Sequence, residues 1–243
     1  MPLLCPQAII DFYIDLNVLL NLGTIVAKRK IPATPSVRRL PSYLHAIRQL
    51  QSEGSEYISG TLIAQELNLE PIQVRKDLAI TGISGKPKKG YPVDALIDAI
   101  ERFLGWASMQ DVIVVGAGNL GSALMGHQEF RSHGMNIVAA FDKNPQKIGT
   151  SIHGIPVLNL DDLETEIHKS GVKVAILAVH SEAAQQTADA LVNAGIQGIW
   201  NFTAIKLKVP EPVVVEMEDL SSGYAMLCVT LQAQGEENGG NSP

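Results

Sequence analysis

The chain has 243 residues, 46% of them hydrophobic, which suits one large globular domain or two small ones. Its two cysteines, Cys5 and Cys228, lie far apart and match no metal-binding or redox spacing. They are therefore expected to be ordinary residues rather than metal ligands and are typical of a reducing, cytoplasmic setting. The net charge of −6 gives the chain as a whole no basic character.

The charge is unevenly distributed along the chain. Residues 1–106 carry 12 Lys or Arg and 10 Asp or Glu, whereas residues 107–243 carry 7 and 15. This asymmetry favours a nucleic-acid contact in the first half, because the acidic second half would repel a phosphate backbone. Two solvated surfaces would give the same counts.

The first 39 residues have the pattern of an extension followed by an arm. Residues 7–26 are apolar, but four Asp and Asn side chains interrupt them and no basic region precedes them. This argues against a transmembrane helix and a signal peptide, and favours a loosely ordered extension or one helix on a partner surface. The basic segment Lys28–Arg39 contains two prolines, which predicts a linker or an arm.

Three helices are predicted next. Apolar residues recur at helical spacing over 42–54, where Ser42 can cap the start and Gly54 can end the helix. Residues 59–82 predict two shorter helices joined by the tight turn Asn-Leu-Glu, with Pro71 in the first turn of the second helix. The side chains expected to face inward from that second helix are Ile72, Val74 and Leu78.

The polar face of this second helix is typical of a DNA-recognition helix in a helix-turn-helix. Arg and Lys on this face can donate to guanine O6 and N7, and Gln can pair with adenine. The residues of the polar face are found among Gln73, Arg75, Lys76 and Asp77. The Gly-, Pro- and Lys-rich segment 82–93 predicts a hairpin or loop whose lysines would neutralise phosphates, as a wing does. A solvated charged face would look similar. The candidate DNA-binding residues are Arg38, Arg39, Ser59, Gln73, Arg75, Lys76, Lys86, Lys88, Lys89 and Tyr91.

An amphipathic helix at 93–106 leads to a boundary near 107–111, after which apolar strands alternate with helices. The strands are predicted at 112–116, 136–142, 172–179 and 198–202, and the helices at 121–134, 160–171 and 181–195. This alternation predicts an α/β fold with a doubly wound parallel sheet of the Rossmann type. A last apolar helix at 219–232 is expected to dock, for example on a second subunit. The tail 235–243 has the composition of a disordered segment.

The loop after the first strand of this sheet carries a dinucleotide-binding fingerprint. Gly116 permits a tight turn, Gly118 lets the backbone approach a pyrophosphate, and Gly121 lets helix and strand pack closely. The phosphates would lie at the helix N-terminus. Asp142 ends the second strand and would accept hydrogen bonds from the adenosine ribose hydroxyls. It therefore favours NAD(H) over NADP(H), although the neighbouring Lys143 weakens that preference.

No acid–base machinery of a dehydrogenase accompanies this fingerprint. His153 is expected in a loop and His168 on a solvated helix face, whereas His127 and His180 are placed where they could face the cofactor. Neither of these last two has an evident Asp or Arg partner, and no substrate domain surrounds them. We therefore predict no catalytic residue and no metal site. An NAD-dependent oxidoreductase with a helical accessory domain is the alternative.

Both halves of the chain resemble the Rex family of redox-sensing transcriptional repressors. The resemblance spans about residues 31–231 and rests on IPATPSVRRLPSYL, QVRKDL, GAGNLGSAL, FDKNPQKIG, GIPVLNLDDLE, AAQQTADALVNAGIQGIWNF and VPEPVVVEMEDL, in that order. It implies a cytoplasmic homodimer with a winged-helix domain, a Rossmann domain and a C-terminal helix swapped between subunits. It also implies that NADH draws the Rossmann domains together and releases a palindromic operator. NAD+ would bind more weakly and leave DNA binding intact.

The resemblance also assigns roles to individual residues. Arg75 and Lys76 fall on the DNA-reading positions of the family, and Asn201 and Phe202 fall on the segment near the nicotinamide. The candidate cofactor-binding residues are Gly116, Ala117, Gly118, Asn119, Leu120, Gly121, His127, Asp142, Lys143, His180, Asn201 and Phe202.

Four departures from the family pattern occur. The usual Ser-Tyr-Phe-Gly after the recognition helix is replaced at 79–82, and Gly-Val-Gly-Tyr near the end of the wing is replaced at 88–91. His127 stands where a tyrosine important to the redox switch usually lies, and His180 stands in place of a proline. Two histidines near the expected nicotinamide predict a pH-dependent response, or a paralogue whose redox sensing is altered.

These observations divide the chain into five parts. They are an extension at 1–30, a winged-helix DNA-binding domain at 31–108, a Rossmann NAD(H)-binding domain at 109–218, a dimerisation helix at 219–233 and a disordered tail at 234–243.

Overall fold

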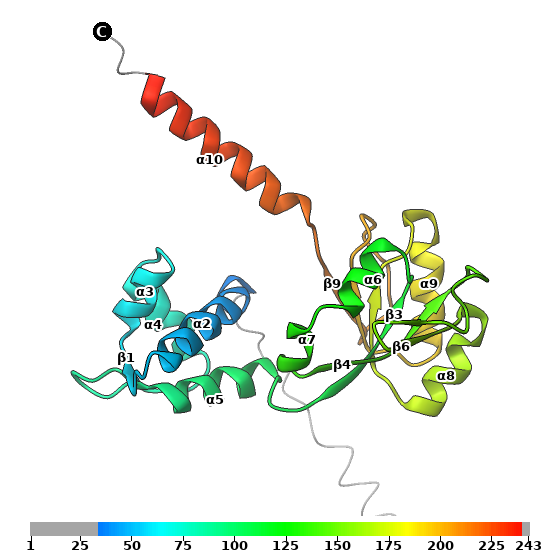
Figure 1. Cartoon of the computed structure of the whole chain (residues 1–243), viewed down its shortest axis with the longest axis horizontal. Coiled ribbons are helices and arrows are strands. Elements are labelled where there is room, and N and C mark those ends of the chain that lie inside the picture. The colour runs from blue at the N-terminus through cyan, green and yellow to red at the C-terminus, as the bar shows by residue number, and fades with distance from the viewer. Residues whose placement is uncertain (1–33, 240–243) are drawn as a thin grey trace, which may run out of the picture. The chain divides into compact units, whose positions relative to one another are not determined.

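A computed structural model of the protein describes residues 34–239. The chain divides into two compact units between Ile100 and Glu101, and Figure 1 shows their elements. The predicted extension at 1–30 and the start of the predicted arm lie outside the described residues.

The first unit is a small helical domain with a two-stranded sheet. Its elements are α2 (Thr34–Ser52), β1 (Tyr57–Ile58), α3 (Gly60–Glu66), α4 (Pro71–Ala79), β2 (Tyr91–Pro92) and most of α5 (Val93–Leu104), which continues past the division at Ile100. The helices α3 and α4 form the predicted helix-turn-helix, and Pro71 lies in the first turn of α4 as expected. The core of the unit gathers side chains from all four helices and from β1. Its largest members are Leu40, Tyr43, Leu44, Ile47, Ile58, Ile63, Leu78, Leu96 and Ile100.

The start of one helix and the inward side of another differ from the expectations for this unit. The helix α2 begins at Thr34 rather than at Ser42, so residues 34–39 of the predicted arm are helical and Ser42 does not cap the helix. Pro41 lies inside α2, where packing of its apolar neighbours overrides the lost hydrogen bond. Ile72 is 64% exposed rather than inward-facing, because it lies two positions before the buried Val74 and so faces the opposite side of α4.

The segment after α4 forms the predicted hairpin. Lys86 and Gly90 form an antiparallel bridge, and β2 then pairs with β1, with Ile58 opposite Tyr91. Gly90 has φ +88°, and a Cβ atom there would clash with the carbonyl oxygen of Ile58. Only glycine therefore lets the hairpin return so close to β1.

The second unit contains a seven-stranded sheet of the predicted doubly wound type. Its strands are β3 (Gln110–Val115), β4 (Met135–Asp142), β5 (Ser151–Ile152), β6 (Ile155–Asn159), β7 (Val174–Leu177), β8 (Gly198–Asn201) and β9 (Val214–Met217). Their order is β5-β6-β4-β3-β7-β8-β9, and every pair except β5–β6 is parallel. Without β5 this is the Rossmann order, whose reversal point lies at the end of β3 beside β7.

Helices cover both faces of this sheet (Figure 1). They are α6 (Asn119–Met125), α7 (Glu129–Ser132), α8 (Leu163–Ser170) with a preceding 3-10 turn at Leu160–Asp162, and α9 (Ser181–Asn193). On one face, α8 and α9 pack against the sheet through buried side chains such as Ile167 and Leu191. The core on the other face contains Met125 of α6 against Val114 and Ile176.

The predicted helix 121–134 is two helices. The chain leaves α6 at Gly126 and re-enters a helix at Glu129. A Cβ atom at Gly126 would lie 2.8 Å from Nε2 of His153, so the glycine that weakens the helix also makes room for that imidazole. His153 and Gly154 form the two-residue turn between β5 and β6, both with positive φ. The loop prediction for His153 is thus confirmed, but the hairpin around it and β9 were missed.

The last helix, α10 (Ser221–Gly239), is longer than predicted. It continues through residues 235–239, which were expected to be disordered, and residues 240–243 lie outside the described range. Its apolar side chains are spread around the helix axis rather than gathered on one face, and Tyr224 and Met226 are both more than two-thirds exposed. None of the helices between residues 34 and 239 has the length and apolar character needed to cross a membrane.

Candidate cofactor and DNA sites

The glycine loop after β3 has the geometry of a dinucleotide-binding turn. Gly116 has φ +99°, and a Cβ atom there would clash with the carbonyl oxygen of Ala178. A Cβ atom at Gly121 would clash with the carbonyl oxygen of Gly116, whereas one at Gly118 would point into open space. Two glycines therefore close the loop, and the third leaves its backbone open to a pyrophosphate.

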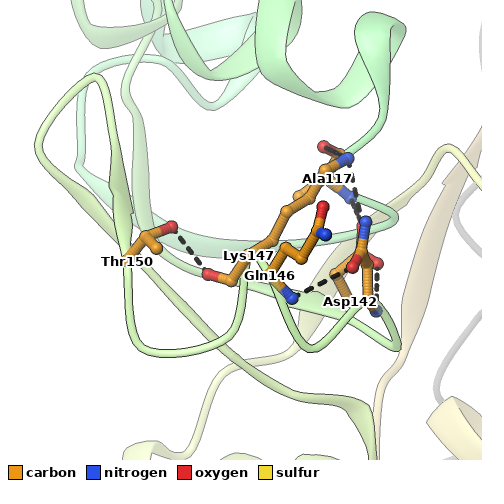
Figure 2. Close-up of polar contacts among 6 residues, drawn as sticks. Ala117, Asp142, Gln146, Lys147 and Thr150 are labelled. Atoms are coloured by element: carbon orange, nitrogen blue, oxygen red, sulfur yellow. Dashed lines mark hydrogen bonds and ion pairs between the residues drawn. The ribbon is translucent and has the colours of Figure 1, made fainter.

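Asp142, at the end of β4, is oriented by backbone hydrogen bonds (Figure 2). Its Oδ2 accepts a hydrogen bond from the N–H of Ala117 at 2.8 Å, and its Oδ1 accepts one from the N–H of Asn144 at 2.8 Å. A carboxylate has about four lone-pair positions, so both oxygens can still accept ribose hydroxyls. The acceptor of an adenosine ribose is thus fixed beside the glycine loop.

Lys147 completes this arrangement and was not among the sequence candidates. Its Nζ donates to the carbonyl oxygen of Ala117 at 2.7 Å and lies 3.9 Å from Oδ2 of Asp142 (Figure 2). A turn brings it there, in which Oδ1 of Asn144 accepts from the N–H of Gln146 at 3.0 Å. In the sequence, the only indication of a role for Lys147 was its position in the FDKNPQKIG segment. Its approach to the glycine loop is visible only in the folded structure.

These groups open onto a cavity of about 640 Å³, a size typical of small-molecule sites. It lies at the carboxyl ends of β3, β4 and β7, where ligands bind in such sheets. Lys147, Ala183 and Thr187 also line it. The sequence candidates that line the cavity are Gly116, Gly118, Asn119, Leu120, Asp142, Lys143, His180 and Phe202.

The remaining cofactor candidates do not line this cavity. Ala117 and Gly121 shape the loop through their backbones. Asn201 is buried; its Oδ1 accepts from the N–H and hydroxyl of Thr203, and its Nδ2 donates to the carbonyl oxygen of Ile205 at 2.8 Å. Asn201 therefore holds the turn that brings the adjacent Phe202 to the cavity wall.

His127 lies on a second cavity of about 420 Å³, together with His153. A series of aromatic rings connects it to the first cavity. The ring of His127 contacts Phe130 at 4.6 Å, Phe130 contacts Trp200 at 5.6 Å, and Trp200 contacts Phe202 at 4.8 Å between centroids. His127 is thus connected to the cofactor cavity through packed rings, whereas His180 lies on that cavity itself.

The DNA candidates of the first unit occupy two exposed regions. Arg75 and Lys76 are exposed on α4, and the wing exposes Lys86, Lys88 and Lys89. Two of the wing lysines are held near an aromatic ring, because Nζ of Lys86 and Nζ of Lys89 lie 5.4 and 5.3 Å from the centroid of Tyr57. Both regions present positive charge to solvent.

The other DNA candidates have structural partners. Ser59 caps α3, since its hydroxyl accepts a hydrogen bond from the N–H of Leu62 at 3.1 Å. Tyr91 packs against Gly85 inside the wing. Arg38 is exposed on α2 and has an interaction of its own.

Arg39 and Gln73 are both bonded to Asp77, which was expected on the polar face of α4 but is fully buried. Burial alone would raise the pKa of Asp77. Hydrogen bonds from Arg39, Tyr43, Ser36 and Gln73 outweigh it and hold the pKa well below its usual value of 3.8. Burial and the bond to Asp77 raise the pKa of Tyr43 to about 12.

Family models match both units. A model described as "CoA binding domain" matches residues 107–205, and one described as "Putative DNA-binding protein N-terminus" matches residues 30–79. Across residues 34–239, no three His, Cys, Asp or Glu side chains gather in a way that could hold a metal ion. The fold and the two sites define a DNA-binding regulator with a nucleotide-binding domain.

Several curated relatives are named "Redox-sensing transcriptional repressor Rex". The one from Treponema denticola is 58% identical over 209 residues, which cover 86% of this chain and 100% of the relative. The one from Bacteroides fragilis is 42% identical over 82% of this chain and 89% of its own length.

Solved structures agree with these relatives. RSP, described as a Rex-family repressor, superposes with a TM-score of 0.79 at 30% identity, covering 88% of this chain and all of its own. Structures of RSP with β-NAD+ and operator DNA and with β-NADH superpose with TM-scores of 0.78 at 31% identity. The superposition with the NAD+ and DNA complex covers 88% of this chain and 100% of that chain, and the superposition with the NADH complex covers 86% and 98%. The chain belongs to the Rex family of redox-sensing transcriptional repressors. The sequence prediction of a repressor rather than an enzyme agrees with the names of these relatives.

Proposed function

We propose that this protein represses transcription in response to the NADH/NAD+ ratio and releases its operator when NADH binds. One observation carries the proposal. A relative of the same fold, RSP, has been crystallised with NAD+ and operator DNA and with NADH, and this chain has the corresponding cleft and helix-turn-helix. Because a repressor acts on chromosomal DNA, the proposal places the protein in the cytoplasm.

The cofactor would bind in the cleft at the ends of β3, β4 and β7. The open backbone at Gly118 supports a pyrophosphate there, and the oriented carboxylate of Asp142 supports a ribose. His180 and Phe202 would line the nicotinamide end, and Asn201 would act through Phe202.

DNA would contact the exposed side of α4 and the wing. Arg75 and Lys76 would read bases or phosphates, and Gln73 could use its free carbonyl oxygen. Lys86, Lys88 and Lys89 would neutralise phosphates. The winged-helix domain at 31–108 and the Rossmann domain at 109–218 remain our proposed functional boundaries.

The protein would act as a homodimer on a palindromic operator, with α10 (in the proposed dimerisation segment 219–233) exchanged between subunits. A helix that is apolar all round is normally buried, and in this single chain Leu227, Val229 and Leu231 are each more than half exposed. The half-buried Val174 and Trp200 on one face of the sheet offer apolar surface for a partner helix. Both features support burial of these apolar surfaces against a second copy of the chain.

The response would be a population shift between two arrangements of the dimer. NADH releases DNA only if it binds the DNA-incompetent arrangement more tightly than the competent one, because only differential affinity moves such an equilibrium. NAD+, which lacks that differential affinity in this proposal, would leave the complex intact.

The test is a mobility shift on a duplex that the chain itself selects from a random-sequence pool, titrated with NADH or with NAD+. We expect NADH to dissociate the complex and NAD+ to leave it intact. The matched control is Gly121→Ala, which blocks the glycine loop without touching the DNA-binding unit and should bind DNA at every NADH concentration. Equal effects of the two cofactors would refute the redox role.

Two other outcomes would select the alternatives. DNA binding without NADH affinity would indicate a paralogue with altered sensing, which the histidine at 127 makes worth testing. Steady NADH turnover with a small carbonyl compound would indicate an oxidoreductase.

A further inference from the structure

One buried carboxylate ties α4 to α2. Oδ2 of Asp77 accepts hydrogen bonds from Nε of Arg39 at 2.7 Å and from the hydroxyl of Tyr43 at 2.6 Å. Its Oδ1 accepts from Nη2 of Arg39 at 3.1 Å and from Nε2 of Gln73 at 2.8 Å. Ser36 also donates to the carboxylate. Four side chains on two helices thus meet at one anion that has no exposed surface.

This network engages one edge of the Arg39 guanidinium, the group through which Arg39 would bind DNA. An arginine binds a phosphate or a guanine with two N–H groups on one edge of its guanidinium, and one of the two such edges of Arg39, formed by Nε and Nη2, is paired with Asp77. Less than a third of the Arg39 side chain is exposed. Its position on α2 is therefore that of an anchor rather than of a free cation.

The network also acts directly on the reading side of α4. Asp77 and Gln73 lie one turn apart, so the bond between them fixes the amide of Gln73 and leaves its carbonyl oxygen free. Arg75 and Lys76 lie in the same turn and are exposed. Any rotation of α4 about its axis would break the Asp77 contacts and move all three reading side chains together.

We propose that Asp77 and Arg39 are positioning residues for operator recognition, which act by fixing the orientation of α4 rather than by touching DNA. This rests on the proposed function. Base readout requires side chains placed to within hydrogen-bond geometry, whereas phosphate contacts tolerate displacement. Loss of the network should therefore reduce the preference for the operator and leave nonspecific binding largely unchanged.

The test compares Arg39→Met with Lys88→Met in the full-length protein. Both remove one positive charge from the DNA-binding unit, but Lys88 is an exposed wing residue expected to contact phosphate. Affinity is measured over a salt series for the duplex that the wild type selects and for a scrambled duplex of equal length. Arg39→Met should lower the ratio of the two affinities about tenfold with an unchanged salt slope. Lys88→Met should weaken both duplexes equally and lower the slope by about one.

Two further variants keep the proposal testable if Arg39→Met does not fold. Arg39→Met leaves a buried carboxylate without its counter-ion, whereas the double variant Arg39→Met/Asp77→Asn removes both charges, keeps an acceptor oxygen for the buried hydroxyl of Tyr43 and should fold. Asp77→Asn keeps the shape, removes the charge and replaces one acceptor oxygen with an NH2 donor, so the hydrogen bonds to that oxygen are lost. Both should show the same loss of operator preference, and NADH affinity should be unchanged because the cofactor cleft belongs to the other unit.

Three results separate the possibilities. A salt slope lowered by about one in Arg39→Met, with both duplexes weakened equally, would make Arg39 a phosphate contact and overturn the inference. A lower melting temperature in Asp77→Asn with full operator preference would make the network merely structural and overturn it as well. A wild-type protein that prefers no duplex would instead refute the proposed function.

Discussion

At the residue scale, the carboxylate of Asp142 is held in place by the N–H groups of Ala117 and Asn144 before any cofactor arrives. Asp142→Ala should weaken NADH binding about tenfold or more, since a hydrogen-bonded charge is lost, and should relax discrimination against NADPH. Titration of both cofactors measures this. Asp111→Ala is the control, because Asp111 lies at the opposite end of β3 and bonds Asn136. An unchanged NADH/NADPH preference would rule out the ribose contact.

Lys147 supports the same site from the other side. Lys147→Met keeps most of the side-chain volume but removes the hydrogen bond to the carbonyl oxygen of Ala117, so the glycine loop is held less firmly. We expect NADH affinity to fall about threefold to tenfold, as for one net hydrogen bond. Lys143→Met, which lies on the cavity without a bond to the loop, should have a smaller effect. Calorimetric titration that finds the reverse order would assign the structural role to Lys143.

Single residues also show where the sequence was informative. The three glycines and Asp142 were recognisable because their roles depend on local backbone geometry and on a fixed spacing. Lys147 and Asp77 were missed or misplaced because their partners are distant in sequence: Ala117 lies 30 residues from Lys147, and Arg39 lies 38 residues from Asp77. A polar side chain on an amphipathic helix looks solvated until the partner helix supplies its counter-ion.

At the element scale, the pairing of α2 with α4 depends on an ionised Asp77. The folded pKa of this group lies below its unfolded value, so its contribution to stability is complete above about pH 3.8 and is lost as the pH falls further. Below that pH the wild-type DNA-binding unit should lose stability faster than Asp77→Asn, in which no carboxylate titrates at this position. Thermal melts followed by circular dichroism between pH 2 and 6, values that bracket about 3.8, measure the difference. Parallel pH profiles would contradict it.

The elements that could be predicted well from the sequence were those whose apolar residues recur with a clear helix or strand periodicity. The helices α3, α5 and α9 and the buried strands β3 and β7 each bury a regular apolar pattern. The two-residue strand β5 and the exposed β9 carry no such pattern, and their place in the sheet comes from pairing with distant strands. The start of α2 was missed because prolines, read locally, predict an arm, whereas the core residues Leu40 and Tyr43 hold that segment in a helix.

At the scale of the whole molecule, the proposed dimer depends on burial of α10. Leu227→Asp/Leu231→Asp places two charges on side chains that are exposed in the single chain but would be buried by a partner. We expect the dimer to dissociate, and operator affinity to fall because both half-sites are no longer bound together. Sedimentation velocity measures the change. Glu216→Asp, an exposed conservative change on β9, serves as the control. A dimer that survives the double substitution would place the interface elsewhere.

The ring series from His127 to Phe202 has an optical consequence. Trp200 lies one ring from the wall of the cofactor cavity, and NADH absorbs light in the range in which tryptophan emits, whereas NAD+ does not. Bound NADH should therefore quench the emission of Trp200 by energy transfer, and Trp200→Phe should abolish most of that quenching while Trp106→Phe should not. The protein would then carry its own fluorescent indicator of which form of the cofactor it holds.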